Sequence, residues 1–403
     1  MKVSTESLPQ AGSVRKRPRI LYLVTEDWYF CSHRLPLACA ALRAGFDVVV
    51  ATRVQDHGRI ILDAGLRLRS LKLRRAGKNP FSELRAISEL IKIYRTEQPD
   101  IVHHVALKPV LYGSLAAWWA RVPAVVNAIT GTGFRLASSD LRARLVRPFI
   151  NGALRLALNR AGSRVILQNP DDRDILGRNV LRNAKEVVLI RGSGVDLELF
   201  RPEPEPPDTP VVLLASRMLR DKGVVEFVKA ARLLRGERVR ARFVLVGDED
   251  RANPSSLSPS WLERMQAEGV VEWWGHRTDM SNVFKASHIV CLPSYREGLP
   301  KVLLEAAASG RPIVTTDTPG CREVVRHGEN GLLVPVREVE ALANAIRVLL
   351  ESPELRHRMG IRGRELVEKQ FGIQKVIEET LRLYDELLSC QPHAAALASG
   401  VTM

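Results

Sequence analysis

The sequence predicts an α/β protein built from two Rossmann-like domains, each a parallel sheet covered by helices, that face a central cleft. Short apolar runs of the kind that form buried parallel strands alternate with helical stretches of about 10 to 15 residues. The alternation stops at residues 201–210, which contain five prolines, and then restarts. A proline-rich break between two similar patterns is typical of a linker between domains.

In the first half, apolar runs alternate with helical patterns. The first run, 19–24, follows a basic segment, 1–18, that we expect to be a flexible tail. The next pattern has helical periodicity and ends at Gly45, a residue type that commonly stops helices. The predicted strands are 19–24, 47–52, 100–103 and 123–127, and the predicted helices are 33–44, 82–96 and 110–121. We place this domain at 19–198.

The second half repeats the arrangement after a linker at 199–210. Its predicted strands are 210–215, 242–247, 286–292, 312–316 and 331–335, with a helix at 223–235 after the first of them. Residues from about 338 to 389 also have a helical pattern. We place the second domain at 211–370, a final helix at 371–390 and a tail at 391–403. In paired domains of this kind, ligands bind at the carboxyl ends of the strands, between the domains.

The composition is that of a globular protein with a strong positive charge. Hydrophobic residues make up 45% of the 403 residues, and the net charge is +15. This charge favours anionic partners such as phosphates and acidic lipids. The basic residues are spread along the chain and aromatic residues are only 5%, so we expect no nucleic-acid partner. No apolar run reaches the length of about 20 residues that a membrane span needs.

The cysteines and the N-terminal segment indicate a cytoplasmic protein. The five cysteines include no C-x-x-C pair, so we expect neither a zinc site nor a disulfide framework. The first apolar stretch after the basic N-terminal segment contains Glu26 and Asp27, which is unlike a secretory signal.

The segment 291–312 carries most of the functional argument. A strand ends near Leu292, a loop with Glu297 and Gly298 follows, and a helix is expected to begin at Pro300. Free amides and the positive end of the helix dipole at such a helix start form a seat for an anion. The helix should end at Gly310.

Two carboxylates, Glu297 and Glu305, flank this predicted anion seat. Pro300 and Glu305 are separated by roughly 7–8 Å of axial rise. One ligand can therefore contact the amides with its middle and a carboxylate at each end, as a nucleoside diphosphate sugar would with its diphosphate, sugar and ribose. The alternative is that Glu305 forms a local cap or ion pair and Glu297 is a solvated turn residue.

Two basic residues follow a strand of the same domain. Arg217 and Lys222 come directly after the strand 210–215 and before a helix. At the mouth of the same cleft, they could neutralise a diphosphate and the charge that develops when it leaves. The alternative is an ordinary basic loop in a basic protein. Their position beside the predicted anion seat favours the functional interpretation.

The first domain offers candidate acceptor contacts. A glycine-bearing loop follows the strand 123–127, and Thr130 and Gly131 could approach an acceptor there. The stretch 141–155 interleaves arginines with apolar residues in a pattern that could lie on an anionic bilayer; the arginines are Arg142, Arg144, Arg147 and Arg155. The alternative is a helix packed on the domain with its arginines solvated.

Taken together, these motifs resemble a retaining glycosyltransferase of family 4, which has the two-Rossmann architecture called GT-B. The resemblance covers about 19 to 388. The motifs that carry it are Glu297-x₇-Glu305, Ser216-Arg217…Lys222-Gly223, Gly194-Val195-Asp196…Phe200-Arg201-Pro202 and Asn330-Gly331-Leu332-Leu333-Val334. The segments Asp27-Trp28-Tyr29-Phe30…His33-Arg34-Leu35-Pro36 and His103-His104…Lys108-Pro109 are similar to those of a bacterial subgroup that builds cell-surface polysaccharides and lipid-linked glycans.

The resemblance implies a role for each motif residue. Arg217 and Lys222 would bind the donor diphosphate, Glu297 the donor sugar and Glu305 the ribose. The backbone of Gly298 and Leu299 would face the phosphates, and Arg277 would lie near the nucleobase. His33, His104, Lys108, Thr130 and Gly131 would lie on the acceptor side, and the last helix would cross back to the first domain.

The chain departs from the family at one position. Many members carry a histidine two residues after the one that matches His103, where this chain has Val105. His104 and Lys108 could take over part of its role, or the acceptor pocket is arranged differently.

The resemblance implies transfer of a sugar, with retention, from a nucleotide diphosphate donor to a glycan or polyprenyl-diphosphate-linked acceptor, and we expect the donor to be a UDP-sugar. We expect no cofactor and no metal. The nearest candidate for a metal site is Asp248-Glu249-Asp250, whose carboxylates are adjacent rather than convergent. Domain closure about the linker would exclude water. The alternatives are a sugar-nucleotide epimerase of the same fold and a basic protein that binds anionic lipid or nucleic acid.

Overall fold

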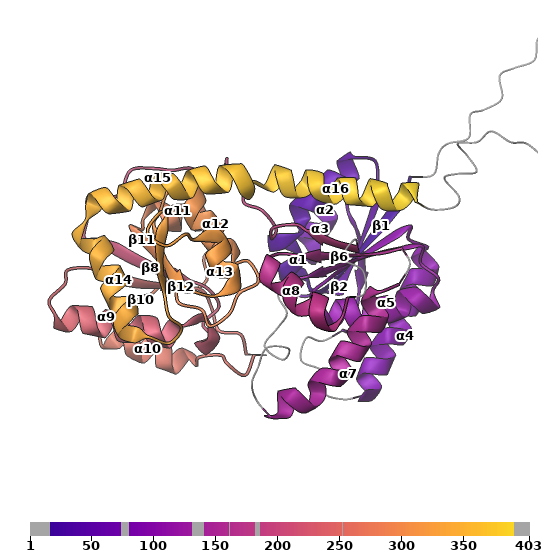
Figure 1. Ribbon diagram of the computed structural model, residues 1–403, viewed down its shortest axis with the longest axis horizontal. Coiled ribbons are helices and arrows are strands. Elements are labelled where there is room, and N and C mark those ends of the chain that lie inside the picture. Colours follow the sequence, from indigo (N-terminus) through magenta and orange to yellow (C-terminus); the bar gives the residue numbers. More distant parts are fainter. Residues whose placement is uncertain are drawn as a thin grey trace, which may run out of the picture.

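The computed structural model describes residues 17–73, 80–130, 141–160, 162–181, 186–251 and 253–390. The chain forms two lobes, each with one parallel sheet and helices on both of its faces (Figure 1). The α/β prediction of two Rossmann-like domains is confirmed. The predicted tails, 1–18 and 391–403, fall almost entirely outside the described residues.

The first sheet has seven parallel strands in the order β3-β2-β1-β4-β5-β6-β7. The strands are β1 (Arg19–Glu26), β2 (Asp47–Arg53), β3 (Arg67–Ser70), β4 (Ile101–Val105), β5 (Ala124–Ile129), β6 (Ser163–Leu167) and β7 (Val187–Leu189). The helices are α1 (Asp27–His33), α2 (Leu35–Arg43), α3 (Gly58–Asp63), α4 (Pro80–Glu97), α5 (Leu107–Trp119), α7 (Leu141–Leu158) and α8 (Pro170–Asn179). The strand order reverses between β1 and β4, which makes this the switch point where ligands bind.

The second sheet has six parallel strands in the order β10-β9-β8-β11-β12-β13. They are β8 (Val211–Ala215), β9 (Arg242–Val246), β10 (Glu272–Trp273), β11 (Ile289–Leu292), β12 (Ile313–Thr316) and β13 (Gly331–Val334). The helices are η2 (Arg220–Lys222, a 3₁₀ turn), α9 (Val224–Gly236), α10 (Pro259–Ala267), α11 (Met280–Lys285), α12 (Lys301–Ala308), α13 (Pro319–Val324), α14 (Val339–Glu351), α15 (Pro353–Gln370) and α16 (Ile373–Ser389). The switch point here lies between β8 and β11.

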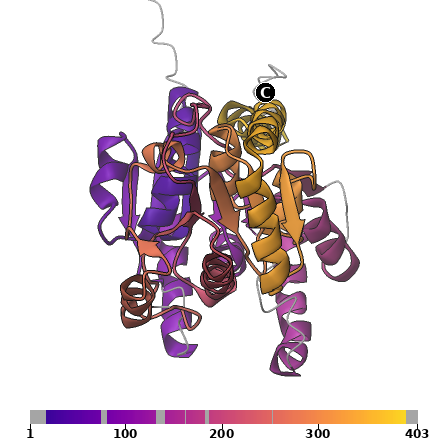
Figure 2. The same ribbon diagram turned by 90° about the vertical axis from the view of Figure 1, so that its left-hand side faces the viewer.

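The last helix completes the first domain. α15 and α16 run along one side of the molecule, with α15 on the second lobe and α16 on the first (Figure 1). Figure 2 shows these helices nearly along their axes. Val376, Ile377 and Tyr384 of α16 are buried in the same core cluster as Tyr22 and Phe30. The helix therefore returns to the first domain, as the family resemblance implies.

The chain crosses between the domains at two adjacent segments. Val195 forms a parallel β-bridge with Gly372, and the amide of Ile373 donates to the carbonyl of Val195 at 3.0 Å. Gly194 has φ +72°, and a Cβ on it would lie 2.6 Å from the Cα of Ile373. Glycine is therefore required where the two crossing segments meet.

The predicted hinge at the proline-rich linker is not supported by its contacts. Within 201–210, Glu205 forms an ion pair with Arg356 at 2.7 Å, and the carbonyl of Pro206 accepts from His288 at 3.0 Å. Both partners belong to the second domain, so the linker is fixed to that domain. Bending is expected instead at the paired crossing of Val195 and Gly372.

The helix predicted at 33–44 is interrupted in the structure. α1 ends at His33 and α2 begins at Leu35, with Arg34 between them at φ −128° and ψ −17°. Pro36 has no amide to donate, and its ring obstructs the preceding turn, so one continuous helix cannot pass through this point.

The turn before α9 gives a direct test of backbone constraint. Gly223 has φ +73°, and a Cβ there would lie 2.1 Å from the carbonyl oxygen of Pro293. We expect Gly223→Ala to lower the free energy of unfolding by about 1–3 kcal/mol. Gly236, where a Cβ would meet nothing within 4 Å, is the matched control, and Gly236→Ala should be neutral or stabilising. Urea unfolding measures both; equal effects would contradict this account.

Candidate functional site

The predicted donor residues gather at the switch point of the second sheet. Arg217 and Lys222 follow β8, and Glu297 follows β11, the strand that pairs directly with β8. The carboxyl ends of these two strands lie side by side, so the two loops meet there. Residues 75 positions apart in the chain, Lys222 and Glu297, are thereby in direct contact.

Glu297 accepts two hydrogen bonds on the same oxygen. Its Oε1 accepts from the ammonium of Lys222, with which it also forms an ion pair, and from the hydroxyl of Ser294 at 2.6 Å. Ser294 is fully buried, so its hydroxyl holds the carboxylate in place from inside the domain. Ser294 was not predicted from the sequence, because a serine after a strand carries no signal by itself.

Arg217 pairs with Asp250, in the loop after β9. Asp250 is one of the three adjacent acidic residues that were the nearest candidate for a metal site in the sequence. Its contact with a guanidinium is the arrangement of an ion pair rather than of a hard-ion site. Among the described residues, no group of three or more His, Cys, Asp or Glu side chains could hold a metal ion.

The start of α12 lies beside this pair of loops. The helix begins at Lys301, with Pro300 as its N-cap, one residue later than predicted, and no side chain caps it. Its first amides are therefore available to an anionic group. Gly310, at φ +68°, follows the end of the helix as predicted.

Glu305 lies inside α12 and is nearly buried. Its Oε1 forms an ion pair with Lys301 at 3.1 Å. Burial raises the pKa of Glu305, and the nearby charge of Lys301 opposes this shift. The local ion pair that the sequence left open as an alternative is therefore present in the structure.

The loop before α12 also contacts the first domain. The carbonyl of Gly298 accepts from the Nδ2 of Asn169 at 2.8 Å, and a Cβ on Gly298 would lie 2.4 Å from the carbonyl oxygen of Thr130. The ammonium of Lys301 donates to the carbonyl of Ser32 at 3.0 Å. Gly298 and Thr130 are thus brought together, while Asn169 and Lys301 are contacts that the sequence analysis missed.

Leu299 packs beside the domain crossing. A Cβ on Gly192 would lie 2.5 Å from Cδ2 of Leu299. The side chain of Leu299 therefore lies close to the segment that leads to Val195, while its backbone belongs to the loop before α12.

His33 lies among cations of both domains. Its ring stacks on Tyr29 with centroids 4.2 Å apart, and its Nδ1 lies 2.5 Å from the hydroxyl of Ser32. Burial, together with the charges of Lys301 and Arg34, lowers the pKa of His33 to about 3. The imidazole is therefore neutral at pH 7, beside the start of α12.

His104 lies in the core, against the acceptor-side prediction. Its Nε2 is 3.0 Å from the hydroxyl of Tyr94, and its Nδ1 is 2.8 Å from Oδ1 of Asn127. The residue is fully buried, and burial lowers its pKa to about 4. Both ring nitrogens have partners inside the domain, so none is left for an acceptor.

Lys108 and Arg277 both have carboxylate partners. The ammonium of Lys108 lies 2.8 Å from Glu83 and over the ring of Tyr112. The guanidinium of Arg277 forms two hydrogen bonds of 2.7 and 2.8 Å with Asp279, and both side chains are exposed. Val105, at the position of the family histidine, is buried at the end of β4.

Part of the predicted acceptor side falls outside the described residues. Gly131 lies outside them, as do the side chains of Arg142, Arg144 and Arg147. Arg155 is described and is exposed on α7.

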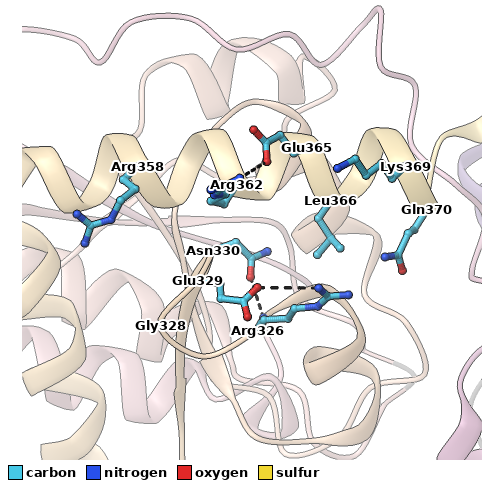
Figure 3. A pocket seen from close by; sticks show the side chains of 10 residues that line it. All are labelled: Arg326, Gly328, Glu329, Asn330, Arg358, Arg362, Glu365, Leu366, Lys369 and Gln370. Carbon is cyan, nitrogen blue, oxygen red and sulfur yellow. Dashed lines mark hydrogen bonds and ion pairs between the residues drawn. The ribbon is translucent and has the colours of Figure 1, made fainter.

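A cavity of about 450 Å³ lies elsewhere, between α15 and the turn before β13 (Figure 3). It is lined by Arg326, Gly328, Glu329, Asn330, Arg358, Arg362, Glu365, Leu366, Lys369 and Gln370. None of the predicted donor or acceptor residues lines it. The side-chain Nδ2 of Asn330 donates to the carbonyl of Val324 at 2.9 Å, so this motif residue stabilises the turn.

Two facing Rossmann sheets, a returning C-terminal helix and charged loops at the second switch point define the GT-B class of proteins. Comparison with known families agrees. Residues 196–366 match the family described as glycosyl transferases group 1, and residues 19–169 match glycosyl transferase 4-like.

A relative from Campylobacter jejuni is 30% identical, over 88% of this chain and 95% of its own length. It is named N,N'-diacetylbacillosaminyl-diphospho-undecaprenol alpha-1,3-N-acetylgalactosaminyltransferase. A relative from Escherichia coli, 25% identical over 76% of this chain and 80% of its own length, is named UDP-Gal:alpha-D-GlcNAc-diphosphoundecaprenol alpha-1,3-galactosyltransferase. The chain therefore belongs to the group 1, or family 4, glycosyltransferases, and it is a glycosyltransferase.

Solved structures share the fold. Sucrose-phosphate synthase from Thermosynechococcus elongatus has a TM-score of 0.75 at 22% identity and covers 93% of this chain and all of its own. The Anabaena protein HepE, solved with UDP and glucose, has a TM-score of 0.73 at 19% identity and covers 91% of this chain and 99% of its own. Within the described residues, no helix is long and apolar enough to cross a membrane.

Proposed function

We propose that this glycosyltransferase moves a sugar from a nucleotide diphosphate donor, most simply a UDP-sugar, to a polyprenyl-diphosphate-linked glycan, with retention at the anomeric carbon. The observation that carries the proposal is the meeting of Arg217, Lys222 and Glu297 at the switch point beside the start of α12. The pathway would be the synthesis of cell-surface polysaccharide, because relatives from Staphylococcus aureus and Rhizobium meliloti are named for capsular polysaccharide and lipopolysaccharide core biosynthesis.

In this proposal the donor diphosphate lies between the two cations and the free amides of α12. The backbone of Gly298 and Leu299 faces the phosphates, and Glu305 accepts from the ribose. Arg277 lies toward the nucleobase. Lys222 then interacts with both Glu297 and a phosphate. Because the donor sugar is attached to that phosphate, it lies next to the Glu297 carboxylate.

The chemistry is leaving-group stabilisation. Arg217, Lys222 and the helix amides stabilise the diphosphate charge that develops as the glycosidic bond breaks. The sugar passes through an oxocarbenium-like state, and the acceptor hydroxyl attacks from the face that the diphosphate leaves, passing its proton to the departing diphosphate oxygen. Because the guanidinium of Arg217 and the ammonium of Lys222 supply the positive charge, the proposal requires no metal ion and no cofactor.

The acceptor would enter from the first domain. His33 and Thr130 are the predicted acceptor-side residues that lie at the start of α12 or its loop. Thr130, Asn169 and Ser32 contact the second domain on this side of the site, and these contacts would help to exclude water, which would otherwise hydrolyse the donor.

A lipid-linked acceptor places the enzyme at the inner face of the plasma membrane, as a peripheral protein. α4 supports this because it exposes Phe81 and Leu84, which are 82% and 62% accessible, next to the exposed Arg85. Apolar side chains beside a cation are the pattern that binds the surface of an anionic bilayer. This end of α4 is linked to the start of α5 through Glu83 and Lys108, so it lies at the carboxyl end of β4, on the ligand side of the sheet.

The double variant Phe81→Ser and Leu84→Ser should bind vesicles of phosphatidylglycerol about tenfold more weakly, because two apolar side chains no longer enter the bilayer. Trp118 and Trp119 provide the control. They are 61% and 57% exposed at the other end of α5, about 15 Å from Lys108 along the helix axis. Sedimentation with vesicles at low salt measures both variants. A larger loss for Trp118→Ser and Trp119→Ser would contradict this orientation.

The function itself is tested by incubating the full chain with a panel of nucleotide sugars, with and without a polyprenyl-diphosphate-linked sugar. Release of nucleotide that depends on this acceptor, and a product with the anomeric configuration of the donor, support the proposal. Conversion of the donor to an epimer without acceptor, or no release from any donor, contradicts it.

A further inference from the structure

Arg34 is a buried cation without a partner. It lies at the break between α1 and α2 and is only 4% exposed. Its Nε is buried without a hydrogen-bond partner, whereas its two terminal nitrogens are not among the buried unpaired atoms and can reach an outside group. The two acidic residues of the β1–α1 junction are engaged elsewhere: Asp27 accepts from backbone amides, and Glu26 accepts from Gln55.

Such an arrangement is costly for a protein. Burial of a charged group without a counter-charge is strongly unfavourable, and buried cations are almost always paired. An arginine cannot relieve the cost by losing its proton. A nearly buried guanidinium with an unpaired Nε and no counter-charge therefore indicates a place where an anion binds.

His103 offers a second unfilled position in the same region. Its Nδ1 lies 2.5 Å from the hydroxyl of Tyr384, while its Nε2 is buried without a partner. Tyr22 connects Arg34 and His103: its ring packs against Phe30, whose carbonyl accepts from the backbone amide of Arg34, and stacks on His103 with centroids 5.2 Å apart. The charge of Arg34 contributes, after the larger effect of burial, to the low pKa of His103. With Nδ1 bonded to the phenol, Nε2 can donate to an oxygen of a ligand.

The backbone supplies a third feature. Arg34 is the N-cap of α2, a nine-residue helix, and no side chain caps this helix. α1 follows β1 and His103 lies on β4, the two strands that form the switch point of the first sheet. The second domain reaches the same place, because Lys301 donates to the carbonyl of Ser32.

We infer that Arg34, His103 Nε2 and the start of α2 form a binding site for a phosphoryl group in the first domain. The inference rests on the proposed transfer to a lipid-diphosphate acceptor, whose diphosphate is the expected occupant. The donor diphosphate is the other possible source of the same chemistry, and the two sources are separated by the experiment below.

The test measures binding of inorganic pyrophosphate by calorimetry to the full chain saturated with UDP, so that the donor site is already filled. In Arg34→Met, which keeps an unbranched apolar side chain without the charge, pyrophosphate should bind about tenfold more weakly or worse, while UDP binds as in the wild type. Arg34→Lys should retain part of the affinity. Arg43→Met, which removes an exposed arginine from the far end of α2, is the control and should change neither affinity.

Two other results have definite meanings. If pyrophosphate does not bind the UDP-loaded wild type, and Arg34→Met weakens UDP about tenfold, the site is supported and its phosphoryl group is that of the donor. The inference is overturned if folded Arg34→Met binds both compounds as the wild type does. It is also overturned if the ligand-free variant melts well below the wild type, since removal of an unpaired buried charge should not destabilise the fold.

These are binding measurements, so they decide the inference whether or not any sugar is transferred. The proposed function could fail in the transfer assay while the phosphoryl site in the first domain is confirmed, and the reverse could also occur.

Discussion

Glu297→Ala is expected to lower the rate of sugar transfer by about 10²–10³-fold, the size of effect seen when one preorganised polar group is removed from an active site. In the structure Glu297 is held at the switch point by Lys222 and Ser294. Its loss removes the group proposed to contact the donor sugar. It also frees the charge of Lys222, so UDP should bind as well as before or more tightly.

This combination is the diagnostic result, because kcat falls while nucleotide affinity does not. Steady-state kinetics with the lipid-linked acceptor and calorimetry with UDP measure the two quantities separately. Glu340→Ala, which removes an exposed carboxylate from the first turn of α14, is the control and should alter neither. A Glu297→Ala enzyme with the full transfer rate would contradict the assignment.

Lys222→Met should lower UDP affinity, in contrast to Glu297→Ala, which should not. A charge-assisted hydrogen bond to a phosphate contributes about 1.5–3 kcal/mol, so UDP affinity should fall by about 10- to 100-fold. The carboxylate of Glu297, now without its ammonium partner, adds repulsion toward the diphosphate. Transfer should also slow, because the leaving charge loses a stabilising cation.

Lys222→Arg should recover part of the affinity, since the charge is kept. Lys229→Met removes an exposed lysine of α9 from the same segment and serves as the control. If UDP binds Lys222→Met as tightly as the wild type, the diphosphate does not lie beside Lys222, and the donor site as proposed is wrong.

The fold was predictable because parallel strands that are buried on both faces appear as short apolar runs. β1, β2, β8 and β12 match such runs closely, and glycine stops placed the ends of α2 and α12 within a few residues. β3, β6, β7 and β10 were missed. β3 is an edge strand with charged residues exposed, and β10 has only two residues, so neither forms an apolar run.

Local rules also set limits within the elements that were found. The break at Arg34 depends on one proline, and the prediction of a single helix overlooked it. The proline-rich linker was correctly recognised as irregular. Its fixation by Arg356 and His288, however, involves residues far away in the chain that sequence spacing does not bring together.

The site was predictable where residues follow strand ends and was not predictable where tertiary contact decides. Strand order brings Arg217, Lys222 and Glu297 together, so position after a strand was sufficient to find them. His104 also follows this rule, but Tyr94 and Asn127 satisfy both of its ring nitrogens inside the domain. Asn169 and Lys301 act across the domain interface, for which one sequence carries no signal.

The most direct test of the central claim is a crystal structure of the full chain with UDP bound. The diphosphate should lie between Arg217, Lys222 and the first amides of α12, with the ribose at Glu305 and the ion pair of Lys222 with Glu297 opened or shared with a phosphate oxygen. UDP bound in another part of the protein, with these residues arranged as they are without it, would contradict the account.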